Sequence, residues 1–174
     1  MKGVANSLFG GWQLTGLYRW TSGFPFSILP GALWATNWQL TQPAVPTGPL
    51  PTTGAYFVNG EPNVFQNPQA AIQDFQPPFA GLSGPRNELR GPGLFDIDAG
   101  LLKTWSITES KKLTFGWQVY NVTNSVRFDV GTMATQNGGS FSGNNTLTNS
   151  ASFGDFTSTL SKPRVMEFSL RFSF

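Results

Sequence analysis

The last nine residues of the chain alternate strictly between apolar and polar side chains. The apolar positions are Met166, Phe168, Leu170, Phe172 and Phe174. The polar positions between them are Glu167, Ser169, Arg171 and Ser173. Successive side chains of a β-strand point to opposite faces of a sheet, so residues two apart share a face. The pattern therefore predicts a strand with one apolar and one polar face, which suits either a membrane barrel or the edge of a soluble sheet.

Three earlier segments show the same alternation, so four strands are expected near residues 11–27, 94–105, 112–121 and 163–174. The apolar positions of the first three are Trp12, Leu14, Tyr18 and Trp20; Phe95, Ile97, Ala99 and Leu101; and Leu113, Phe115, Trp117 and Val119. Each apolar face extends over about four or five positions. That length matches the roughly 9–11 residues that a tilted strand needs to cross a bilayer.

The connections between these strands differ greatly in length. A short turn, 106–111, joins the second strand to the third, whereas long loops are expected at 28–93 and 122–162. Loops this long are uncommon inside compact soluble domains, but outer-membrane barrels alternate long extracellular loops with short periplasmic turns. We therefore predict that the whole chain, 1–174, is a partial outer-membrane β-barrel domain. Its all-β fold would place about four antiparallel strands in the C-terminal part of a transmembrane β-barrel with long extracellular loops.

The charged residues of the expected strands favour a polar lumen on one side of the sheet. An Arg or Lys that faces lipid at mid-depth costs about 2–4 kcal/mol. The polar residues expected to face the lumen are Arg19, Asp96, Asp98, Gln118, Glu167 and Arg171. Lys103 breaks the pattern because it shares a face with Leu101, and we expect its ammonium group to reach the membrane interface.

The composition favours a membrane-embedded β protein. Charged residues make up 11% and aromatic residues 14% of the 174 residues, whereas soluble domains average roughly 25% charged residues.

The sequence contains no Cys and no His, which removes disulfides, the usual general base and the commonest metal ligand. Asp96 and Asp98 lack the further oxygen ligands that calcium requires. We expect no enzymatic activity, no cofactor and no metal, and a net charge of +2 gives no reason to expect nucleic acid as a partner.

Aromatic and basic residues in the first long loop are candidates for ligand contact. They are Trp34, Trp38, Tyr56, Arg86 and Arg90. The aromatic rings could stack on a sugar, and the arginines could bind an anionic ligand. Alternatively, the aromatic residues pack within the loop and the arginines anchor it at the outer rim of the barrel.

Several segments of the chain resemble late strands of Oar-like TonB-dependent receptors. These segments are Gly10–Phe26, Arg86–Asp98, Tyr120–Asn124, Phe153–Gly154, Thr159–Arg164 and the terminal strand. The resemblance implies a barrel of about 22 strands in the outer membrane of a Gram-negative-type bacterium. It also implies an N-terminal plug and the uptake of scarce ligands with energy delivered through TonB. In this family the terminal aromatic strand is read by the barrel-assembly machinery, which implies that role for Phe168, Leu170, Phe172 and Phe174.

The resemblance also sets the expected partners. They are the lipid of the outer membrane, the barrel-assembly machinery, the remaining strands and plug of the full-length protein and, indirectly, the TonB system. Because the smallest such barrels have about eight strands, we expect this chain to be incomplete on its own. The alternative is a soluble β-sandwich that acts as a carbohydrate-binding or adhesive module. Such a module would bury its aromatic faces against a second sheet and would not require detergent.

Overall fold

The computed structural model describes residues 3, 8–29, 43–76, 78, 81–133 and 152–174. Strands dominate this part of the chain, and all the strand pairs are antiparallel. In chain order the elements are β1 (Trp12–Thr21), β2 (Pro25–Phe26), β3 (Val45–Pro46), β4 (Thr53–Val58), β5 (Glu61–Phe65), α2 (Pro68–Gln73), β6 (Phe75–Gln76), β7 (Leu89–Arg90), β8 (Leu94–Ser106), β9 (Lys112–Tyr120), η2 (Val130–Thr132) and β10 (Val165–Ser173). The predicted all-β antiparallel fold is confirmed.

The chain divides into two compact units. The first consists of Met1–Thr21, Leu94–Val126 and Lys162–Phe174, and the second consists of Ser22–Gly93 and Arg127–Ser161. Each unit is therefore built from segments that lie far apart in the sequence.

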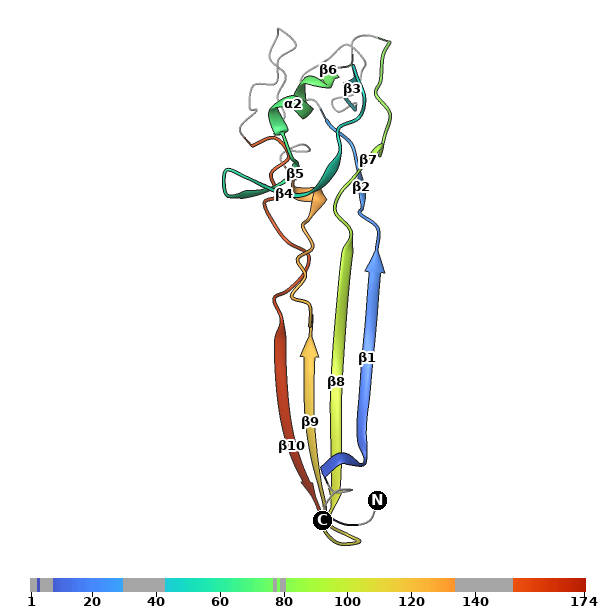
Figure 1. The fold of residues 1–174 in the computed structure, drawn as a ribbon. Helices are drawn as coiled ribbons and strands as arrows, with labels where there is room; N and C mark the ends of the chain where they lie inside the picture. The colour runs from blue at the N-terminus through green and yellow to red at the C-terminus, as the bar shows by residue number, and fades with distance from the viewer. Residues whose placement is uncertain (1–2, 4–7, 30–42, 77, 79–80, 134–151) are drawn as a thin grey trace. The chain divides into compact units, whose positions relative to one another are not determined.

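The first unit is a four-stranded sheet with the order β1-β8-β9-β10 (Figure 1). The register pairs Leu14 with Leu101, Leu101 with Trp117, and Trp117 with Phe168 across the three strand junctions. The turn between β8 and β9 is closed by backbone hydrogen bonds from the N–H groups of Ile107 and Thr108 to the carbonyl of Lys111. This turn and the C-terminus lie at the same end of the sheet.

The sequence predicted one strand near 11–27, whereas the structure divides this segment. β1 ends at Thr21, and the two residues of β2 pair with β7 in the second unit. The backbones of Gly23 and Gly91 approach so closely that a Cβ atom at Gly23 would lie 1.6 Å from the Gly91 carbonyl oxygen. The backbone N–H of Gly91 also donates a hydrogen bond to the carbonyl of Phe24. This close approach between glycines, which only residues without a Cβ allow, breaks the ladder that the alternation alone would extend.

The segments predicted as long loops hold the second unit, which has its own hydrophobic core. The buried members of the core are Phe26, Ile28, Ala44, Val64, Phe65, Ala71, Ile72, Phe75, Leu89, Val130, Met133, Phe153 and Phe156. The rings of Phe65 and Phe153 stack with their centroids 5.2 Å apart, which joins the two segments of the unit. Apolar residues spread thinly along two connections thus come together through long-range packing.

Local signals shape the elements of the second unit. β4 and β5 form a hairpin whose turn places Asn59 and Gly60 at φ values of 54° and 88°, and Asn-Gly is the pair that such tight turns favour. Helix α2 begins after Asn67, whose side chain accepts a hydrogen bond from the N–H of Ala70, and Pro68 occupies its first turn. Across the described ranges of the chain, no helix is long and apolar enough to cross a membrane.

Candidate functional site

The register of the four-stranded sheet separates its side chains into two faces. Directly opposed residues point to the same side of a sheet, so the rows of apolar residues in the four strands combine. The apolar face consists of Trp12, Leu14, Gly16, Tyr18 and Trp20; Phe95, Ile97, Ala99, Leu101, Lys103 and Trp105; Leu113, Phe115, Trp117 and Val119; and Met166, Phe168, Leu170 and Phe172. Lys103 is the one charged member of this set.

Large apolar side chains on this face are uncovered within the first unit. Leu14 is 78% exposed, Leu170 is 70% exposed and Phe168 is 68% exposed. A contiguous apolar surface of this kind marks contact with lipid or with another apolar surface.

Aromatic residues border the apolar face near both ends of the sheet. Tyr18 and Phe95 pack edge to face with ring centroids 5.3 Å apart near one end, and Trp12 and Trp105 pack at 6.4 Å near the other. From Phe95 to Trp105 the strand rises about 33 Å, at roughly 3.3 Å per residue. At the tilt of about 40° usual in barrels, this rise corresponds to an apolar band about 25 Å tall. The outer members of the two pairs, Phe95 and Trp105, therefore have the spacing of the two girdles of a membrane barrel, whereas Trp12 and Tyr18 lie further inside the band.

Lys103 is accommodated on the apolar face by neighbouring groups of the same unit. Its ammonium group donates to the backbone carbonyl of Gly10 and lies 5.2 Å from the ring centroid of Trp12 and 5.6 Å from that of Trp105. The residue is 2% exposed. The ammonium group thus lies beside the aromatic pair that borders this end of the sheet, and a carbonyl and the faces of two indole rings surround its charge.

The six residues predicted to face the lumen lie together on the opposite, polar face. Arg19 is paired directly with Asp96, Gln118 lies between Gly100 and Glu167, and Arg171 is paired with Thr114. The structure brings Arg19, Asp96 and Asp98 into contact with one another, whereas Arg171 lies near the other end of the sheet.

Arg19 forms the centre of a charged cluster. Its Nη2 lies 2.6 Å from Asp96 Oδ2 and 3.6 Å from Asp98 Oδ2. Asp98 Oδ1 accepts a hydrogen bond from the backbone N–H of Asn121 at 2.9 Å. Among the groups that the structure describes, Asp96 Oδ1 is buried without a hydrogen-bond partner. The Arg19 guanidinium offsets one of the two carboxylate charges and connects β1 to β8. Among the described residues, no group of three or more His, Cys, Asp or Glu side chains gathers that could hold a metal ion.

Asn121, which the strand pattern did not predict as a site residue, is the most extensively hydrogen-bonded residue at the end of β9. Its Nδ2 donates to the carbonyls of Ser125 and Lys162, and its Oδ1 accepts from the N–H of Ser125. Its backbone has a left-handed φ of 52°, a conformation that asparagine tolerates better than most residues. The side chain thus joins the end of β9 to the approach of β10. The sequence feature that could have identified Asn121 is its position in an Asn-x-x-Asn segment, 121–124.

The candidate ligand-contact residues of the first long loop have separate surroundings. Trp34 and Trp38 lie outside the described residues. Tyr56 is half-buried and pairs with Asn63 in the β4–β5 hairpin. Arg86 is exposed and lines a depression of ≈ 360 Å³ together with Ser27 and Pro43, among others. The guanidinium of Arg90 donates to the carbonyl of Gly23 at 3.3 Å, and so it holds a turn of its own unit.

An antiparallel sheet with one apolar face between aromatic borders and one polar face is the wall of a membrane-spanning β-barrel. A comparison with family models agrees, because residues 1–167 match the outer membrane beta barrel domain, and the chain belongs to this family. The predicted outer-membrane barrel is thereby confirmed, and the family supports location in the outer membrane. Neither a curated protein nor a solved structure matches the chain.

Proposed function

We propose that this chain forms four adjacent strands in the wall of an Oar-like TonB-dependent receptor that takes up ligands across the outer membrane of a Gram-negative-type bacterium. The observation that carries the proposal is the register of the sheet, which places most of the large apolar residues on one face and, apart from Lys103, the ionic and amide residues on the other. The family match supports the barrel. The resemblance of Gly10–Phe26 and Arg86–Asp98 to late strands of such receptors supports the finer assignment.

The edges of the sheet indicate what else the barrel requires. In the described part of the chain, β1 and β10 each have one neighbouring strand in this sheet. Backbone N–H and C=O groups exposed to hydrocarbon must be hydrogen-bonded, so further strands have to complete the ladder on both sides. We infer that the partners of this chain are the other strands of the barrel and a plug in its lumen, through which TonB acts indirectly.

The polar face and the second unit each contain candidate residues for ligand contact. Arg19, Asp96, Asp98, Gln118, Glu167 and Arg171 would line the lumen, and the segments of the second unit would form extracellular loops. Arg86 is the best candidate for ligand contact there, because it is exposed at a depression, whereas Arg90 is engaged with Gly23. No enzymatic role, cofactor or nucleic acid is part of the proposal. The family match favours this function over the soluble β-sandwich.

Cysteine accessibility tests the membrane placement of the sheet. The natural sequence contains no cysteine, so single substitutions give clean signals. In outer membranes, Ser169→Cys and Gln118→Cys should react with a hydrophilic maleimide, because both positions lie on the polar face. Leu170→Cys and Trp117→Cys on the apolar face should be protected until detergent is added. Equal reactivity of the two sets would contradict the barrel orientation.

Uptake is tested separately from placement. In a defined medium analysed by mass spectrometry, cells that lack this protein and cells that lack TonB should leave the same compound unconsumed. If loss of the protein leaves depletion of the medium unchanged, or if the defect is independent of TonB, the transport assignment is wrong even where the barrel placement holds.

A further inference from the structure

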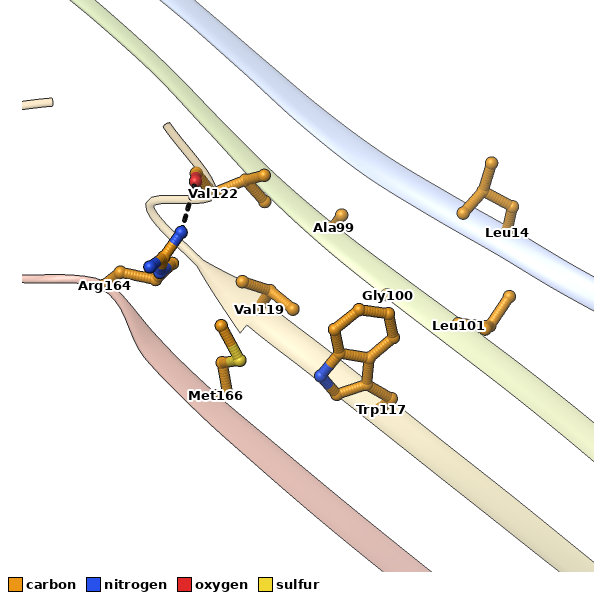
Figure 2. A pocket seen from close by; sticks show the side chains of 9 residues that line it. All are labelled: Leu14, Ala99, Gly100, Leu101, Trp117, Val119, Val122, Arg164 and Met166. Carbon is orange, nitrogen blue, oxygen red and sulfur yellow. Dashed lines mark hydrogen bonds between the residues drawn. The ribbon is translucent and has the colours of Figure 1, made fainter. Parts of the chain in front are cut away.

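The apolar face of the sheet contains a groove of ≈ 290 Å³ (Figure 2). It is lined by Leu14, Ala99, Gly100, Leu101, Trp117, Val119, Val122, Arg164 and Met166. Along its floor the register aligns Gly16, Ala99, Val119 and Met166 across the four strands. The adjacent row, which contains Leu101 and Trp117, is bulkier. The groove therefore arises because small side chains lie beside large ones, and nearly every group that lines it is apolar.

One cation, Arg164, lies at the end of this groove. Its backbone N–H donates to Asn124 Oδ1 at 3.1 Å, which fixes the residue at the start of β10. Its Nη1 makes a long hydrogen bond of 3.4 Å to the carbonyl of Val122 (Figure 2). The side chain is exposed, and a guanidinium has five N–H donors. Most of its hydrogen-bonding capacity is therefore available to a ligand.

Lys103 on the apolar face and Arg164 just before β10 differ in how their charge is compensated. Lys103 is buried against the carbonyl of Gly10 and two indole rings. Arg164 has no carboxylate within ion-pair distance in the described part of the chain. A cation on a surface that faces lipid is costly unless an anionic group accompanies it. The charge of Arg164 therefore indicates an anionic ligand, and the apolar groove beside it indicates a hydrocarbon chain.

We propose that this groove binds an anionic, phosphate-bearing membrane lipid, with one acyl chain along the groove and the lipid phosphate on the guanidinium of Arg164. The proposal rests on the proposed function, since it requires that the apolar face contact the membrane. Arginine binds phosphate through parallel N–H···O hydrogen bonds, which makes it better suited to this contact than lysine. Trp117 forms a wall of the groove and so reports on its occupancy.

Quenching of Trp117 fluorescence by brominated lipids tests the proposal. The natural protein, purified from outer membranes, is reconstituted in phosphatidylcholine with a small fraction of brominated phosphatidylglycerol or of brominated phosphatidylcholine. The Trp117 signal is the difference between the protein and a Trp117→Phe variant. We expect quenching by the anionic lipid to exceed quenching by the zwitterionic lipid at least twofold. Arg164→Gln should abolish the excess and Arg164→Lys should reduce it, whereas Arg171→Gln, on the polar face of the same strand, should preserve it.

Each outcome has a distinct meaning. Equal quenching by the two lipids, or an excess that survives in Arg164→Gln, would overturn the lipid site while leaving the apolar face in contact with the membrane. Absence of quenching by either lipid would contradict the membrane placement itself, and the lipid site with it. Loss of the excess on addition of inorganic phosphate would show a site for free phosphate and would also overturn the proposal. Retention of heat-dependent gel mobility by the variants verifies that they are folded.

Discussion

Asn121 shows how much one side chain contributes where two strands meet. Its amide group forms hydrogen bonds to Ser125 and Lys162, and its backbone adopts a left-handed conformation. Asn121→Ala removes about three hydrogen bonds, each worth about 1 kcal/mol net, and adds about 1 kcal/mol of backbone strain. We expect a loss of about 3–4 kcal/mol in the free energy of unfolding, measured by urea titration of the refolded protein in lipid vesicles.

Asn121→Gly is the matched control for this prediction. Glycine tolerates the left-handed φ without strain but makes none of the side-chain hydrogen bonds. Its stability should therefore lie between those of the natural protein and Asn121→Ala. Equal stability of all three proteins would show that the hydrogen bonds of Asn121 do not contribute.

Glu88 gives the second unit a pH dependence of known sign. Burial raises the pKa of the Glu88 carboxyl group above its usual value because desolvation disfavours the charged form. The folded state therefore binds a proton more readily than the unfolded state. The free energy of unfolding consequently increases as the pH falls through the pKa that Glu88 has in the folded state. Glu88→Gln should raise the unfolding temperature at pH 7, and the difference should vanish in acid. A thermal unfolding series over this pH range measures the effect, with Glu61→Gln, at an exposed position of the same unit, as the matched variant.

Lys103 illustrates which residue-level features the sequence could reveal. Its position on the apolar face followed directly from the alternation. The means by which its charge is compensated did not, because Gly10, Trp12 and Trp105 come together only when the strands pair. Asn121 was missed for the same reason, since its partner Lys162 is distant in the sequence.

At the scale of the element, the long strands were the most predictable part of the fold. The residue ranges of β8 and β9 agree closely with those that the alternation predicted. A period of two that continues over many residues allows only one register. The first expected strand was divided, since alternation does not reveal the backbone contact between Gly23 and Gly91.

That contact provides a test of the junction between β2 and β7. In Gly23→Ala the new Cβ atom would meet the Gly91 carbonyl 1.6 Å away, so the backbone has to separate and the Gly91 N–H loses its bond to Phe24. We expect a loss of more than about 3 kcal/mol, in the range of severe substitutions. Limited proteolysis of the second unit in intact outer membranes should show cleavage at lower protease concentration. Gly48→Ala, whose new Cβ would lie 3.4 Å from a flexible Asp74 oxygen, should remain resistant.

The apolar row of β10 yields a prediction about assembly. We propose that Phe168, Leu170, Phe172 and Phe174 are recognised by the barrel-assembly machinery. Phe172→Ser should then reduce the amount of protein in the outer membrane several-fold, measured by immunoblotting of membrane fractions. Ser173→Ala, on the opposite face of the same strand, should leave the amount unchanged. If both variants assemble normally, the apolar row is not the recognised feature.

At the scale of the whole molecule, the sequence predicted the barrel wall and not the second unit. The wall was predictable because each strand carries its own two-faced pattern. The core of the second unit depends on contacts such as that between Phe65 and Phe153. A local sequence pattern does not predict contacts between residues so far apart in the chain. The alternation predicted that the six candidate lumen residues share one face of the sheet. It did not predict the depression beside Arg86, because that depression depends on contacts between distant segments.

The composition of the second unit has a consequence for the order of folding. Its two segments, Ser22–Gly93 and Arg127–Ser161, flank the stretch that contains β8 and β9. Asn63 donates to the carbonyl of Phe153 at 2.7 Å and to Asp155 Oδ1 at 2.8 Å, so the unit cannot be completed before the later segment is available. Once it forms, it ties both ends of the β8–β9 hairpin to one folded body. The chain between them is then a closed loop with fewer conformations than a free one, which lowers the entropic cost of pairing those two strands.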